Sequence, residues 1–90
     1  MSVERVLKVV NEKGLHARAS AKFVEVVENF NANAEVEKDG MSVSGDSIMG
    51  LLMLAASRGT EIRVVTTGDQ AEPLLEALAK LLDDKFGEPF

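Results

Sequence analysis

The sequence predicts an α+β fold in which one four-stranded, mostly antiparallel sheet is covered on one face by helices. Segments rich in β-branched residues alternate with segments of helical periodicity, in the order strand, helix, strand, strand, helix, strand, helix (βαββαβα). An Asp-Gly pair between the second and third strands marks a tight hairpin. The 90 residues contain no internal repeat or low-complexity linker. We therefore expect residues 1–90 to form a single domain with a modest core.

The first strand and the first helix flank a polar turn. Residues 3–10 are rich in valine and read as a strand, and residues 11–14 form the turn that leads to the helix. Gly14 suits such a turn. The helix that follows places His16 and Arg18 in its first turn and ends near residues 29–33. Its apolar residues recur at spacings of three and four, which gives a stripe of Ala19, Phe23, Val26, Val27 and Phe30.

The middle of the chain contains the hairpin and a very apolar segment. Residues 34–38 and 41–44 are predicted strands on either side of Asp39-Gly40. Asp46 and Ser47 are helix-start residues in front of the apolar segment 48–56. Because this segment is apolar nearly all round, part of it should face solvent and mark a contact site. A core helix with poor amphipathicity is the alternative.

The last third predicts a strand, a helix and a loose tail. Residues 60–67 read as a strand with Ile62 and Val64 on one face. The helix after it begins either with a capping box from Asp69 to Glu72 or with Pro73 at its first position. Its leucine stripe is too short for a coiled-coil seam, so we expect a monomer. Residues 87–90 should be loose. The stripe consists of Leu74, Leu75, Leu78, Leu81 and Leu82.

Composition excludes several classes of function. The chain has no cysteine and one histidine, which argues against disulfides and a zinc site. A net charge of −5, with no Trp or Tyr, argues against nucleic-acid binding. No apolar run approaches the roughly 20 residues of a membrane span. The N-terminus lacks the basic segment followed by an apolar segment that is typical of a signal peptide. We expect a cytoplasmic protein that does not contact membranes.

His16 and Arg18 are the residues most capable of taking part in a reaction. A helix start offers unpaired N–H groups and a partial positive charge, which favour an anion. A neutral imidazole has one lone-pair nitrogen and can act as a nucleophile. Together with the Arg18 guanidinium, this arrangement could accept a phosphoryl group and stabilise its oxygens. An ordinary surface histidine without a reactive role is the alternative.

Three pieces of sequence resemble one known family. They are Gly14-Leu15-His16-Ala17-Arg18, the Asp39-Gly40 hairpin, and Ser47-Ile48-Met49-Gly50 at the start of the second helix. At this spacing, and over nearly the whole chain, the sequence resembles HPr, the histidine-containing phosphocarrier of the bacterial phosphotransferase system. The resemblance implies an open-faced β-sandwich with three helices on one side of the sheet. It implies no cofactor and no metal.

The resemblance also implies roles for particular residues. His16 would be phosphorylated on Nδ1 by enzyme I, with phosphoenolpyruvate as the ultimate donor, and would pass the group to a histidine of an enzyme II A-type partner. Such a protein is a transiently phosphorylated carrier and not an enzyme. Arg18 would move between the phosphoryl oxygens and the partner, and Ser47 matches a regulatory serine that a dedicated kinase/phosphorylase modifies in some bacteria. The implied docking residues are Ala17, Ile48, Met49, Leu52 and Met53.

Two residues depart from the family pattern. Ala19 stands where proline is usual after the arginine, which should leave the preceding loop freer. Asp46 stands where many members have lysine, and its charge would oppose a phosphate on Ser47. Both departures keep open a regulatory branch of the same machinery, concerned with nitrogen or carbon metabolism. A third hypothesis is a binding module with an incidental histidine.

Overall fold

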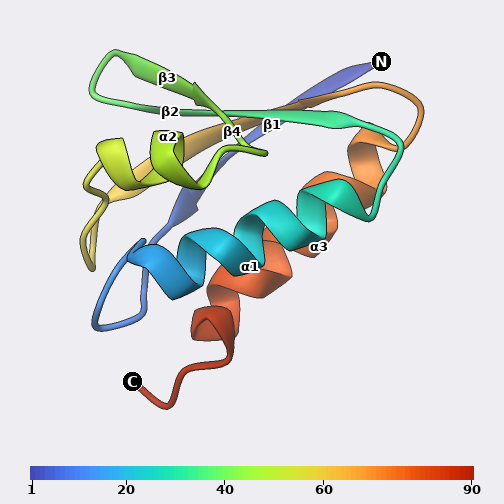
Figure 1. The fold of residues 1–90 in the computed structure, drawn as a ribbon. Coiled ribbons are helices and arrows are strands. Elements are labelled where there is room, and N and C mark those ends of the chain that lie inside the picture. The colour runs from blue at the N-terminus through green and yellow to red at the C-terminus, as the bar shows by residue number, and fades with distance from the viewer.

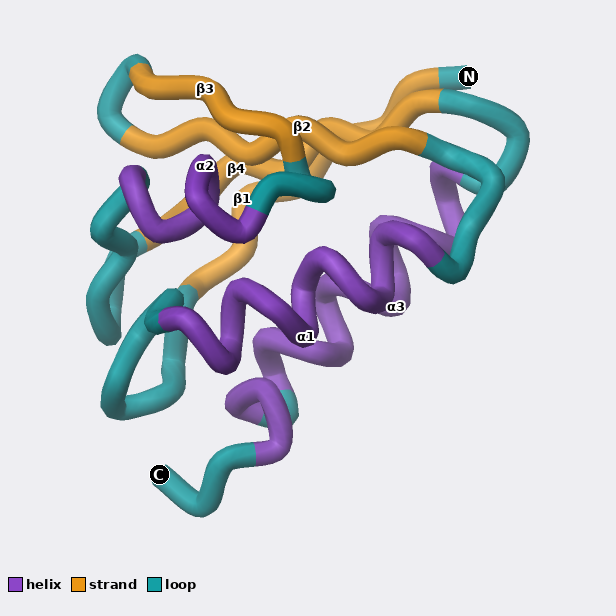
Figure 2. The backbone as a smooth tube through the Cα atoms, in the orientation of Figure 1, coloured by secondary structure: helices purple, strands orange, loops and turns teal.

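The computed structural model describes residues 1–90 and forms two layers, a sheet and a layer of helices (Figure 1). All three α-helices lie on the same side of the four-stranded sheet, as predicted (Figure 2). The elements in chain order are β1 (Ser2–Lys8), α1 (Ala17–Glu28), β2 (Asn33–Lys38), β3 (Met41–Ser44), α2 (Ile48–Met53), β4 (Glu61–Thr67), α3 (Ala71–Asp83) and a 3₁₀ turn, η1 (Lys85–Gly87).

The sheet has the strand order β1-β4-β2-β3, and every neighbouring pair is antiparallel. β4 lies inside the sheet and alternates between its two faces: Ile62, Val64 and Thr66 are buried, whereas Arg63 is exposed on the open face. The register pairs Val64 with Val36 of β2. The buried side chains of the strands meet those of the helices in one cluster of 19 residues, which confirms an α+β fold with one core.

Local sequence signals predicted α1 and the hairpin well. Asp39 and Gly40 both have positive φ, 52° and 83°, as a two-residue turn of the type I′ class requires. The buried residues of α1 are Ala19, Ser20, Phe23, Val24 and Val27. Val26 and Phe30 are only half-buried at the edge of the predicted stripe, so the stripe lies slightly further round the helix than expected.

Two helix boundaries differ from the prediction. α2 ends at Met53 and not at residue 56, because Leu54 is its C-cap and Ala55 has a φ of 51°, which stops the helix. α3 begins at Ala71 after the N-cap Gln70, so neither Asp69 nor Pro73 starts it. Pro73 is the third helical residue, where its missing N–H has no partner to lose.

The prediction of a loose tail is wrong. After α3 the chain makes the turn η1, in which Phe86 is completely buried in the core. The Phe90 carbonyl accepts a hydrogen bond from the Glu12 N–H at 3.0 Å. We call residues 85–90 the C-terminal strap, since they lie across the loop between β1 and α1. No helix of the structure has the length and apolar character needed to span a bilayer.

Candidate functional site

The loop before α1 is held rigidly against the segment after α2. Gly14 has a φ of +68°, and a Cβ atom at this position would lie 2.5 Å from the Ala56 carbonyl oxygen. The Leu15 N–H donates to the same carbonyl at 2.9 Å, and the Leu15 side chain is buried. Glycine is therefore required both by the backbone conformation and by the close approach of another segment. This packing fixes the point at which His16 enters the helix.

His16 is the N-cap of α1 and not part of its first turn, with φ −77° and ψ −177°. Its Nδ1 atom accepts a hydrogen bond from the Arg18 backbone N–H at 3.2 Å. Histidine thus takes the place of the usual Ser, Thr, Asp or Asn cap. The side chain is 28% exposed, so one edge of the ring faces solvent beside the free amides of the helix start.

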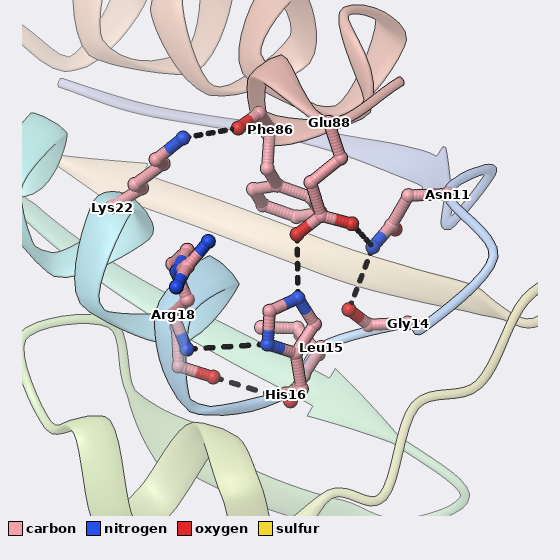
Figure 3. A network of polar contacts seen from close by, with 9 residues as sticks. Asn11, Gly14, Leu15, His16, Arg18, Lys22, Phe86 and Glu88 are labelled. Atoms are coloured by element: carbon pink, nitrogen blue, oxygen red, sulfur yellow. Dashed lines mark hydrogen bonds and ion pairs between the residues drawn. The ribbon is translucent and has the colours of Figure 1, made fainter. Parts of the chain in front are cut away.

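The other ring nitrogen contacts the C-terminal strap. His16 Nε2 lies 2.5 Å from Glu88 Oε2, and Asn11 Nδ2 donates to Glu88 Oε1 at 3.0 Å (Figure 3). Asn11 is completely buried and also donates to the Gly14 carbonyl at 2.8 Å. Three segments that are distant in sequence, the loop, the helix start and the strap, therefore meet at one imidazole.

The environment of Glu88 changes its acidity. Partial burial alone would raise the pKa of its carboxyl group, since it disfavours the charged form. Hydrogen bonds from Asn11 and His16, together with the charges of His16 and Lys13, act in the opposite direction and are stronger in sum. The net effect lowers the pKa of Glu88 below its ordinary value of 4.5. Glu88 is thus held as a carboxylate next to the ring.

Arg18 and an open cavity complete the site. The Arg18 side chain is exposed and forms no hydrogen bond or ion pair, so its guanidinium is free to meet an anion. The cavity beside the ring has a volume of about 570 Å³. It is lined by Glu12, Lys13, His16, Ala17, Arg18, Glu88, Pro89 and Phe90.

The apolar residues singled out in α2 are exposed beside this site, as expected for a short helix that is apolar nearly all round. The exposed fractions are 40% for Ile48, 70% for Met49, 36% for Leu52 and 65% for Met53, whereas Leu51 and Leu54 are buried. α2 lies next to the N-terminal half of α1 (Figure 1). Ala17 is exposed there too. The helix start and the exposed side of α2 can therefore contact one partner together.

Ser47 and its neighbour Asp46 lie at the start of α2. The Ser47 hydroxyl is the N-cap and accepts a hydrogen bond from the Gly50 N–H at 3.0 Å. Asp46 is exposed and accepts a hydrogen bond from the Ser44 hydroxyl at 2.6 Å. The helix-cap reading of Ser47 is thereby confirmed.

Ala19 is completely buried at the third position of α1. Its backbone N–H donates to no backbone carbonyl, because the first such bond of the helix runs from Ser20 to the His16 carbonyl. A proline at this position would lose no hydrogen bond. Bonds elsewhere hold the loop, including the one from the Ser20 hydroxyl to the Leu15 carbonyl at 3.2 Å.

Reasoning from the sequence missed Asn11 and Glu88. The sequence pattern places Asn11 only in a polar turn and Glu88 in a loose end. A signal for the strap was present, because Phe86 continues the apolar spacing of Leu78 and Leu82 by one more step of four. That spacing would have predicted a buried anchor near the C-terminus. It would not have predicted the contact between Glu88 and His16.

Comparison with known proteins identifies the class. The family model described as "PTS HPr component phosphorylation site" matches residues 3–84. The phosphocarrier protein HPr of Xylella fastidiosa (strain Temecula1) is 42% identical over 86 residues, which cover 96% of this chain and 97% of that protein. The HPr-like protein Crh of Bacillus subtilis is 37% identical over 83 residues, covering 92% and 98% of the two chains.

Solved structures agree with this result. HPr-C-His from Thermoanaerobacter tengcongensis superposes with a TM-score of 0.93 at 38% identity and covers 98% of this chain and 99% of that one. An HPr dimer from the same organism matches with a TM-score of 0.77 at 39% identity, with coverages of 91% and 94%. The molecule is thus an open-faced β-sandwich of the phosphocarrier class. The chain belongs to the HPr family of the phosphotransferase system.

Proposed function

We propose that His16 accepts a phosphoryl group on Nδ1 from enzyme I, with phosphoenolpyruvate as the ultimate donor, and passes it to a histidine of an enzyme II A-type protein. The observation that carries this proposal is the position of His16. It is the only histidine of the chain, it caps α1, and its ring borders an open cavity. A carrier must present its reactive atom to two partners in turn, and a partly exposed ring at a helix start meets that need.

The transfer follows from the surroundings of Nδ1. The Nδ1 lone pair attacks phosphorus, and the bond from phosphorus to the donor breaks as the Nδ1–P bond forms. The Arg18 backbone N–H, which donates to Nδ1 at 3.2 Å, then turns to a phosphoryl oxygen. Amides at a helix start and a guanidinium stabilise that oxygen charge by charge-assisted hydrogen bonds. Since these groups are partly exposed, the stabilisation stays modest and the group can leave again.

The docking surface in this proposal consists of Ala17 and the exposed side of α2. An apolar patch beside a polar reaction site suits a transient partner, because it supplies binding energy without contacting the transferred group. Enzyme I and the acceptor would use the same surface in succession.

The decisive experiment is labelling with phosphoenolpyruvate and enzyme I, followed by mapping of the modified residue. We expect acid-labile, alkali-stable phosphate on His16 and none on the H16A variant. An R18A variant should be labelled more slowly, with K80A as the control, since Lys80 is an exposed cation on α3 without a partner. Full labelling of H16A would refute the proposal, and an unlabelled wild-type protein would favour a binding module.

A regulatory role is the second candidate. Ser47 is half-buried at the start of α2, and a phosphate there would lie beside the docking patch. Asp46 next to it would oppose the added charge, which favours a divergent, regulatory branch over routine serine control. Pull-down of regulatory proteins would support this branch, whereas recovery of sugar permeases alone would argue against it. Ultracentrifugation tests the expected monomer, because a related HPr forms a dimer.

A further inference from the structure

The C-terminal strap is anchored firmly enough to place a functional group. Phe86 is buried in the core, and its carbonyl accepts a hydrogen bond from Lys22 Nζ at 2.6 Å. Lys85 and Phe86 have positive φ angles of 57° and 56°, a conformation that non-glycine residues adopt at a cost. The burial and the hydrogen bond offset that cost. The chain then leaves the turn with Glu88 directed at the loop before α1 (Figure 3).

Asn11 fixes the orientation of the Glu88 carboxylate. Both hydrogens of the Asn11 amide are used, one on the Gly14 carbonyl and one on Glu88. The opposite orientation of the amide would point its oxygen at two other oxygens, so only this orientation is stable. One carboxylate oxygen is thereby held by Asn11, and the other is left for His16.

The two neighbours of the His16 ring determine where its proton resides. The Arg18 backbone N–H can only donate, so Nδ1 accepts and carries no proton. Glu88 as a carboxylate can only accept, so Nε2 carries the proton and donates it. A neutral ring between these groups has one favoured tautomer. Its lone pair is on Nδ1, the nitrogen at the helix start.

We propose that Glu88, oriented by Asn11, is a positioning residue that holds the Nε2 proton of His16 and thereby keeps the Nδ1 lone pair available for phosphoryl transfer. This inference rests on the function proposed above. When the Nδ1–P bond forms, the proton stays on Nε2 and the ring gains a positive charge, which the carboxylate stabilises. When the phosphoryl group leaves, the bonding electrons return to Nδ1 and the same neutral tautomer is restored. No proton has to move in either direction.

The role resembles that of the carboxylate behind a catalytic histidine in hydrolases, which fixes the tautomer and stabilises the imidazolium without taking the proton. The two cases differ in the part of the chain that supplies the carboxylate. Here the carboxylate comes from a terminal segment 72 residues away from the histidine in sequence.

The test compares E88A and E88Q with E25Q, a matched control because Glu25 is exposed on α1 without a hydrogen-bond partner. Nitrogen-15 NMR at a pH where the ring is neutral reports the tautomer without any phosphoryl transfer. We expect the proton on Nε2 in the wild-type protein and E25Q, and a mixture of tautomers in E88A. E88Q keeps an acceptor for Nε2 but loses the charge, so it should be intermediate.

The second readout is the kinetics of labelling by enzyme I. E88A should lose about tenfold or more in kcat with little change in KM, because the ring is misplaced while the docking surface is intact. A wild-type ring protonated on Nδ1, or an E88A variant that matches E25Q in both readouts, would overturn the positioning role alone. A wild-type protein that enzyme I does not label would overturn both the role and the proposed function.

Discussion

Replacing Phe86 by alanine tests whether the strap is part of the folded core. The side chain is completely buried in the main cluster, and Phe→Ala changes at such positions cost about 3–5 kcal/mol. A domain of 90 residues has a total stability of roughly 5–13 kcal/mol. The F86A variant should therefore lose about a quarter or more of its free energy of unfolding. It should also share the slow labelling of E88A, since the released strap no longer places Glu88 at the ring.

Urea denaturation followed by circular dichroism measures the first effect. F90A is the matched control, because Phe90 is 69% exposed and bonds to the loop only through its backbone. We expect F90A to remain within about 0.5 kcal/mol of the wild-type protein. If F86A and F90A had the same midpoint and slope, the strap would be docked too weakly to hold Glu88 at the His16 ring, and the positioning role of Glu88 would be refuted.

Three further outcomes follow from particular contacts. The pKa of Glu88 is lowered below 4.5 in the docked strap, so docking should be complete above pH 4.5 and should weaken as the pH falls through the lowered pKa. Amide NMR shifts of the strap should follow this change in the wild-type protein, and those of E88Q should not. The G14A variant should lose more than about 2 kcal/mol in urea denaturation, since its Cβ would meet the Ala56 carbonyl at 2.5 Å; a loss below 0.5 kcal/mol would contradict the close approach. The S47A variant should lose about 1 kcal/mol with the cap to Gly50, and an S47D variant, which retains a cap oxygen, should recover most of it.

The sequence predicted those features of the fold that interactions between nearby residues determine. Asp39-Gly40 specifies its hairpin, and the spacing of Ala19, Phe23 and Val27 specifies the buried face of α1, because each signal acts over a few residues. The exposed side of α2 was also predictable, since a short helix with apolar residues all round cannot bury them all. The expected family and fold class were confirmed for the same reason: the diagnostic residues lie in these locally determined elements.

The strap and its contacts were not predictable in this way. The contact of Glu88 with His16 joins positions 72 apart, and a terminal Gly-Glu-Pro-Phe segment has the composition of a disordered end. The prediction for the start of α3 was wrong for a related reason. The Asp69 carboxylate accepts a hydrogen bond from Asn31 of the neighbouring loop at 3.2 Å instead of capping α3, and the N-cap Gln70 makes no side-chain bond to the helix. In both cases tertiary contacts outweigh local preference.

The two ends of the chain lie at opposite ends of the molecule (Figure 1), with residue 90 beside the cavity and residue 1 at the far end of the sheet. This placement decides how the protein should be handled in the laboratory. A purification tag or fluorophore joined after Phe90 would emerge next to His16 and pull on the segment that carries Glu88. The same group joined before Met1 would leave the imidazole and the exposed side of α2 unobstructed.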